Sequence, residues 1–123
     1  MHNKDDRLRP FSGKHILVVE DEFLLAERLR RGLVESGARV VGPVGNVEGA
    51  RALIAEAHID AAILDISLNG EMVFAIAERL EREAIPFVFA SAHNVSDLPL
   101  RYRKYPLCSK PVEIHQIASA LFG

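Results

Sequence analysis

Five polar side chains spread along the chain have the types that phosphoryl transfer requires. Glu20 and Asp21 follow the apolar run HILVV, Asp65 ends AAILD, Ser91 ends PFVFAS and Lys110 ends PLCSK. Carboxylate oxygens without paired histidine or cysteine suit Mg²⁺ or Mn²⁺, and a carboxylate can also attack phosphorus. A lysine and a hydroxyl can then stabilise the phosphoryl oxygens. If the fold brings these groups together, they form a magnesium-dependent phosphoryl acceptor.

The apolar runs before these side chains alternate with segments of helical periodicity. The expected strands are 15–19, 38–44, 61–65, 86–91 and 106–110, and the expected helices are 23–37, 46–56, 72–82 and 112–122. This alternation predicts a doubly wound α/β fold, with a five-stranded parallel sheet and helices on both faces. Ligands of such folds bind at the carboxyl ends of the strands. All five polar side chains are expected at that edge.

Position along the strands assigns a role to each side chain. Asp65 is the preferred nucleophile because it stands alone at the end of a central strand, and its carboxylate also contacts the metal. The adjacent Glu20 and Asp21 suit metal binding. Lys110 is expected to pair with one phosphoryl oxygen and Ser91 to donate a hydrogen bond to another.

Composition restricts the class of protein. The chain has 123 residues, 49% hydrophobic and 26% charged, which fits one globular domain. Its formal charge of -2 does not indicate the net positive charge that is typical of nucleic-acid-binding domains. No apolar run reaches the ~18 residues that a membrane span needs. A lone Cys108 and a polar N-terminus predict a reduced, cytoplasmic protein. Residues 1–12 are expected to be a mobile extension and residues 13–123 the folded domain.

The order and spacing of the motifs resemble the receiver domains of bacterial two-component response regulators. That family has an acidic pair after the first strand, a phosphorylated aspartate after the third, Ser or Thr after the fourth and Lys-Pro after the fifth. The matching segments here are VVEDE, AILDISL, FVFASAH and CSKP. The resemblance implies a stand-alone receiver that takes phosphate from a histidine kinase or histidine phosphotransfer protein and changes partner binding. It implies no enzyme activity on a separate substrate.

The same resemblance implies finer features of the fold and site. The sheet is flavodoxin-like with strand order 2-1-3-4-5. Asp21 contacts Mg²⁺ directly, Glu20 does so through water, and the backbone carbonyl of Ser67 completes the protein ligands. The Lys110–Pro111 peptide is cis.

The sequence also departs from the family pattern. The loop DISLNGEMV lacks a Met-Pro pair, and Leu107 stands where many receivers have a switch aromatic. We therefore expect output through the face of residues 96–110 without an aromatic rotamer switch, with Leu107 buried and residues 92–105 ordering on phosphorylation. The basic segment RYRKY, 101–105, is expected to be a solvated or partner-binding face. Ser91 and Ala92 replace the Thr and Gly of a single-domain subgroup with a Phe-Ala-Thr-Gly signature.

Two other functions stay open at this point. A haloacid-dehalogenase-like phosphatase also uses an aspartate nucleophile, but it needs a second Asp where this chain has Ser67. A degenerate receiver can act as a binding module without being phosphorylated. The histidines at 15, 58, 93 and 115 show no ligand spacing along the sequence, so no histidine metal site is expected. His93 is expected near the proposed pocket, and the sequence assigns it no role.

Overall fold

The computed structural model describes residues 10–92 and 98–123. The strands are β1 (His15–Val19), β2 (Arg39–Val44), β3 (Ala61–Asp65), β4 (Ser67–Leu68), β5 (Glu71–Met72), β6 (Phe87–Ser91) and β7 (Leu107–Ser109). The helices are α2 (Phe23–Glu35), α3 (Val47–Glu56), α4 (Phe74–Arg82) and α5 (Ile114–Phe122), with a short 3-10 helix η2 (Leu100–Tyr102).

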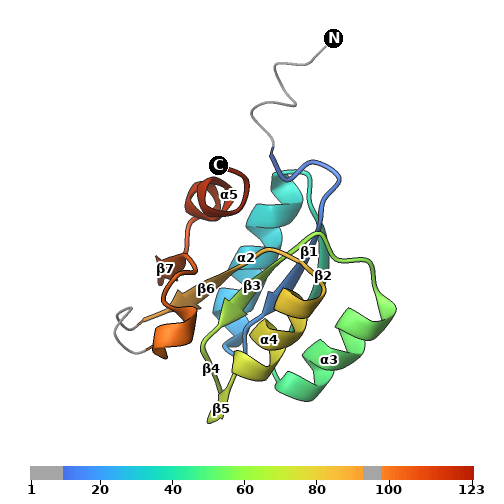
Figure 1. Cartoon of the computed structure of the whole chain (residues 1–123). Coiled ribbons are helices and arrows are strands. Elements are labelled where there is room, and N and C mark those ends of the chain that lie inside the picture. The colour runs from blue at the N-terminus through green and yellow to red at the C-terminus, as the bar shows by residue number, and fades with distance from the viewer. Residues whose placement is uncertain (1–9, 93–97) are drawn as a thin grey trace.

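The main sheet has five parallel strands in the order β2-β1-β3-β6-β7. This is the predicted order 2-1-3-4-5 once the small β4–β5 hairpin is counted separately. Helices α2 and α5 cover one face, and α3 and α4 cover the other (Figure 1). The predicted flavodoxin-like fold is therefore confirmed.

Strand β1 shows why both faces of the sheet are apolar. Ile16 and Val18 belong to the core beneath α2 and α5, whereas Leu17 and Val19 belong to the core beneath α3 and α4. All four side chains are at most 1% exposed. A strand packed on both faces needs a continuous apolar run rather than an alternating one, which is the pattern of HILVV.

The loop after β3 differs from the sequence-based expectation. Helix α4 begins at Phe74 rather than at residue 72, because residues 67–68 and 71–72 pair as an antiparallel hairpin. Asn69 and Gly70 form its turn, with φ of 53° and 92°. An Asn-Gly pair favours such a turn because both residues tolerate positive φ. Likewise, α5 begins at Ile114 rather than at residue 112.

The packed domain begins earlier than residue 13. Residues 1–9 lie outside the described part of the chain. Phe11 is fully buried, and its ring packs edge-on against that of Phe122, with ring centroids 5.4 Å apart. The backbone N–H of Gly13 also donates to the carbonyl of Gly37 at 2.9 Å. Burial of this aromatic side chain ties residues 10–12 to the core, so the predicted boundary at residue 13 is too late.

The segment between β6 and β7 also departs from expectation. Residues 93–97 lie outside the described part, and the remainder holds only η2, in line with the poor helix signal around Pro99. Tyr102 is 5% exposed and stacks on Phe74 at 5.0 Å, so RYRKY is not simply a solvated face. Leu107, predicted to be buried, is half-buried. Aromatic packing draws the tyrosine inward while the basic neighbours stay at the surface.

None of the helices in residues 10–92 and 98–123 has the length and apolar character needed to span a bilayer.

Candidate functional site

The sheet brings the predicted polar side chains to one edge. Glu20 directly follows β1, Asp65 and Ser91 end β3 and β6, and Lys110 directly follows β7. The strands are parallel, and Asp65 lies opposite Ala90, the residue before Ser91, in the β3–β6 pair. Residues far apart in the sequence therefore meet in space, as the strand-end rule requires.

Lys110 joins the two buried carboxylates of the site. Its Nζ atom lies 2.9 Å from Glu20 Oε1 and 3.1 Å from Asp65 Oδ2. Burial alone would lower the pKa of Lys110, but the hydrogen bonds to both carboxylates outweigh it and raise that pKa. The ammonium group thus stays charged and holds both acids in place.

Burial and like charge act against ionisation of Asp65. Its side chain is buried, and this desolvation, together with repulsion from Glu20, raises its pKa from 3.8 to about 6. The hydrogen bond from Lys110 lowers it by less. A perturbed carboxylate beside a charged partner at a strand end is characteristic of functional sites.

The acidic side chains fit a hard divalent cation. Glu20, Asp21 and Asp65 each offer an oxygen within 4.8 Å of the others. Oxygens bound to one Mg²⁺ lie at most about 4.2 Å apart, so a set of this spread is compatible with a single Mg²⁺ ion. Gly45 lets the loop after β2 pass close to this group, because a Cβ atom there would lie 3.2 Å from Asp21 Cα.

The remaining predicted residues occupy the same edge. Ser91 is buried, and its carbonyl accepts a hydrogen bond from the Lys110 backbone N–H at 3.0 Å. Ser67 is exposed and begins β4, two residues beyond Asp65. The peptide between Lys110 and Pro111 is cis, as the family resemblance implied.

Glu22 has a role that the sequence did not indicate. Its side-chain Oε1 accepts hydrogen bonds from the backbone N–H groups of Leu24 and Leu25 at 2.7 and 3.2 Å, so it is the N-cap of α2. A glutamate is an uncommon N-cap, so residue type alone does not indicate this role. Glu22, the third acid of the EDE run, therefore stabilises helix α2 and is not one of the predicted metal ligands.

Truncation of Asp21 and of Glu22 to alanine should have different effects on stability and on Mg²⁺ affinity. Glu22→Ala is expected to lower the free energy of unfolding by about 1 kcal/mol, through loss of the cap, and to leave Mg²⁺ affinity nearly unchanged. Asp21→Ala is expected to weaken Mg²⁺ binding about tenfold or more with little change in stability. Urea unfolding and Mg²⁺ titration by NMR measure the two effects. Equal Mg²⁺ affinities in the two variants would show that the metal is bound elsewhere.

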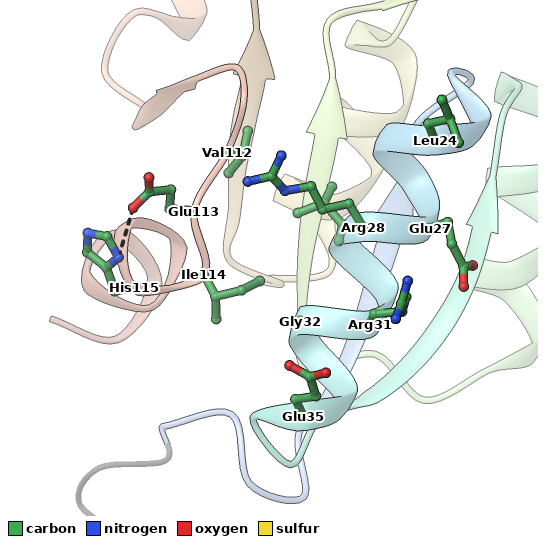
Figure 2. A pocket seen from close by; sticks show the side chains of 11 residues that line it. Leu24, Glu27, Arg28, Arg31, Gly32, Glu35, Val112, Glu113, Ile114 and His115 are labelled. Carbon is green, nitrogen blue, oxygen red and sulfur yellow. Dashed lines mark ion pairs between the residues drawn. The ribbon is translucent and has the colours of Figure 1, made fainter.

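A separate hollow lies between α2 and α5 (Figure 2). Its volume is about 640 Å³. Gly32 and Ile114 both line it and lie so close that a Cβ atom on the glycine would come within 2.7 Å of the isoleucine Cγ1. The lining mixes acidic, basic and apolar side chains, and Asp65 is not among them. The predicted nucleophile and metal ligands thus belong to the cluster at the strand ends rather than to this groove.

Comparison with known proteins agrees with the geometry. The family model of the response regulator receiver domain matches residues 16–121. The chain belongs to this family. The solution structure of SdrG from Sphingomonas melonis Fr1 is 40% identical, with a TM-score of 0.79, covering 89% of this chain and 93% of that one.

Two curated relatives of this receiver domain are bacterial regulators. The uncharacterized transcriptional regulatory protein YbdJ of Bacillus subtilis is 31% identical over 72% of this chain and 40% of its own length. Transcriptional regulatory protein MalR of the same species is 28% identical over 87% of this chain and 48% of its own length. The receiver domain thus spans less than half of these relatives.

Proposed function

We propose that this receiver domain accepts a phosphoryl group from a phosphohistidine onto Asp65 in a Mg²⁺-dependent step and thereby changes partner binding. The observation that carries the proposal is the meeting of a buried, strand-end carboxylate with Lys110 and two further acids. SdrG, a relative at 39% identity and a TM-score of 0.75, also has a structure in a BeF3-activated conformation. This conformation of a relative supports the proposal that the present domain functions through phosphorylation.

The residues of this chain divide the work of phosphoryl transfer. An Asp65 carboxylate oxygen attacks phosphorus, the new O–P bond forms as the N–P bond breaks, and the electron pair stays on the donor's imidazole nitrogen. Lys110 exchanges its contact with the carboxylate for one phosphoryl oxygen, and the Ser91 hydroxyl donates to another. Glu20, Asp21, Asp65 and the Ser67 carbonyl would hold the metal, which would neutralise phosphoryl charge when bound.

Intact mass spectrometry distinguishes the candidate functions. The chain is incubated with Mg²⁺ and acetyl phosphate, with a chelator control. One phosphoryl adduct per chain that requires Mg²⁺ supports the receiver function. Continued release of phosphate over many turnovers would indicate a phosphatase, and neither adduct nor turnover would indicate a binding module.

Transfer from a protein donor needs a docking surface beside the pocket, because Asp65 is only 6% exposed. Phe23 and Leu24 begin α2 immediately after the acidic residues and are 77% and 72% exposed. Leu24 also lines the groove between α2 and α5 (Figure 2). We infer that a helix of the phosphohistidine donor packs on these two side chains and presents its histidine to the pocket.

The double substitution Phe23→Ala and Leu24→Ala should separate protein docking from chemistry. It is expected to slow transfer from a phosphorylated histidine phosphotransfer protein at least about tenfold, since exposed apolar anchors dominate binding energy. Labelling by acetyl phosphate should stay at the wild-type rate. Val34→Ala, which truncates a 49% exposed side chain near the far end of α2, is the matched control. Equal slowing with both donors would argue against docking there.

Output is proposed to run through the face of residues 96–110, of which 98–110 are described. The hydrogen bond from the Lys110 backbone N–H to the Ser91 carbonyl connects the ends of β6 and β7. Movement of Ser91 or Lys110 toward a phosphoryl group should therefore shift the segment between these strands. Arg101 in turn pairs with Glu81 of α4 at 2.8 Å. A pull-down with and without beryllofluoride identifies proteins that depend on this change.

A further inference from the structure

A second polar cluster lies at the opposite edge of the sheet from Asp65. His15 begins β1, and His58 and Asp60 lie in the loop that leads from α3 into β3. His58 Nε2 is 3.0 Å from Asp60 Oδ1, and His15 Nδ1 is 3.4 Å from Asp60 Oδ2. The two imidazole rings meet edge-on with centroids 5.1 Å apart. Three potential metal ligands thus converge although the sequence showed no ligand spacing.

One atom of this cluster has unused bonding capacity. His15 Nδ1 is buried from solvent and has no hydrogen-bond partner among the described residues, since its contact with Asp60 lacks hydrogen-bond geometry. A buried polar atom without a partner costs free energy. A metal ion bound to that nitrogen would supply the missing interaction.

We propose that His15, His58 and Asp60 form a binding site for Zn²⁺. One ligand atom from each lies within 4.8 Å of the others. Two imidazole nitrogens and one carboxylate oxygen are ligands that zinc uses in three-residue sites, where water fills the fourth position. Imidazole favours zinc over magnesium, so this site and the all-oxygen pocket at Asp65 select different ions.

Asp60 is already held in an orientation that suits this role. Its Oδ2 accepts the His15 backbone N–H at 2.7 Å, which leaves Oδ1 turned toward His58. That backbone hydrogen bond is the main reason that the pKa of Asp60 lies below its ordinary value, so the carboxylate stays ionised. Hydrogen bonds of this kind fix metal ligands before the metal arrives.

The zinc site is independent of the proposed phosphoryl chemistry. His15 and Glu20 stand at opposite ends of β1, and five residues of extended strand separate them by about 16 Å. Neither set of ligands includes a residue of the other. Loss of zinc binding should therefore leave labelling of Asp65 by acetyl phosphate intact, and failure of that labelling would not bear on zinc.

Isothermal titration of ZnCl2 into the full chain, with excess Mg²⁺ to fill the acidic pocket, tests the site. We expect one binding event per chain that weakens as the pH falls, because protons compete for the imidazoles. His58→Gln should weaken it at least about tenfold. This side chain is 70% exposed, so its loss should not unfold the domain. His115→Gln is the matched control, because His115 is also exposed and its ion-pair partner is Glu113, at 3.3 Å, outside the proposed zinc site.

NMR of the histidine rings gives a second measurement that does not depend on affinity. Zinc should shift the ring nitrogen signals of His15 and His58 together and leave those of His115 in place. Absence of zinc binding by the wild-type chain, or equal affinity in the His58→Gln variant, would overturn the proposal. In that case the three residues would serve only as an ion-paired link between β1 and the loop before β3.

Discussion

Asp65→Asn should leave the domain folded and remove its ability to accept a phosphoryl group. After incubation with Mg²⁺ and acetyl phosphate, the variant is expected to show only the mass of the unmodified chain. The amide oxygen of asparagine is neutral and a poor nucleophile, while its size and shape match those of aspartate. Lys110 keeps Glu20 as a partner at 2.9 Å, so the pocket should persist.

A neighbouring carboxylate provides the control for this prediction. Glu71 is exposed on β5, only a few residues beyond Asp65, and takes no part in the acidic cluster. Glu71→Gln should be labelled at the wild-type rate. Labelling of Asp65→Asn at the wild-type level would show that another residue accepts the phosphoryl group, and peptide mapping would then locate it.

The acidic pocket could be predicted because its position depends on few assumptions. Each of Asp65, Ser91 and Lys110 follows or ends an apolar run, and parallel strands place their carboxyl ends at one edge. Strand identity and direction are therefore enough to bring these side chains together. The sheet order was also predicted correctly, although from family resemblance rather than from periodicity.

Features that depend on local packing escaped prediction. The N-cap role of Glu22 escaped prediction because a cap is defined by backbone geometry rather than by residue type alone. The hairpin of residues 67–72 was not predicted because two residues per strand are too few to give a periodicity signal. It occupies residues that were expected to begin α4. Phe11 and Tyr102 are buried by contacts with distant aromatic rings.

The histidine cluster shows a different limit of sequence reasoning. His15 and Asp60 are 45 residues apart, and they meet because the start of β1 lies beside the loop before β3. Ligand spacing in sequence detects sites built on one helix or loop. It does not detect side chains brought together at the amino-terminal edge of a sheet. The rule that ligands bind at the carboxyl ends of the strands does not apply to that edge either.

The same Asp65→Asn substitution should stabilise the metal-free protein at neutral pH. Asp65 has a pKa of about 6 in the folded domain, against an ordinary 3.8, because burial and Glu20 disfavour its charge. A shift of about two units corresponds to about 3 kcal/mol of lost stability when the group is ionised. Asparagine removes that charge but bonds more weakly to Lys110, so we expect a net gain of about 1 to 2 kcal/mol.

The direction of the Asp65 pKa shift determines how the stability gain of Asp65→Asn depends on pH. The folded state holds the Asp65 proton more tightly than the unfolded state does. Protonation of Asp65 therefore contributes stability that is fully present below about pH 4 and is lost as pH rises through about 6. The advantage of Asp65→Asn should therefore be small at pH 4.5 and full at pH 7.5. Urea unfolding in a chelating buffer at both values measures it.

Addition of Mg²⁺ should cancel or reverse the stability advantage of Asp65→Asn over the wild type. The wild-type site keeps all of its carboxylates, and its stability should rise with the logarithm of the Mg²⁺ concentration once that exceeds the dissociation constant. The variant has lost one of the proposed ligands. At pH 7.5 and saturating Mg²⁺, the wild type is expected to equal or exceed Asp65→Asn in stability. A stability difference that is the same at both pH values and unaffected by Mg²⁺ would show that repulsion within the acidic pocket does not govern the ionisation of Asp65.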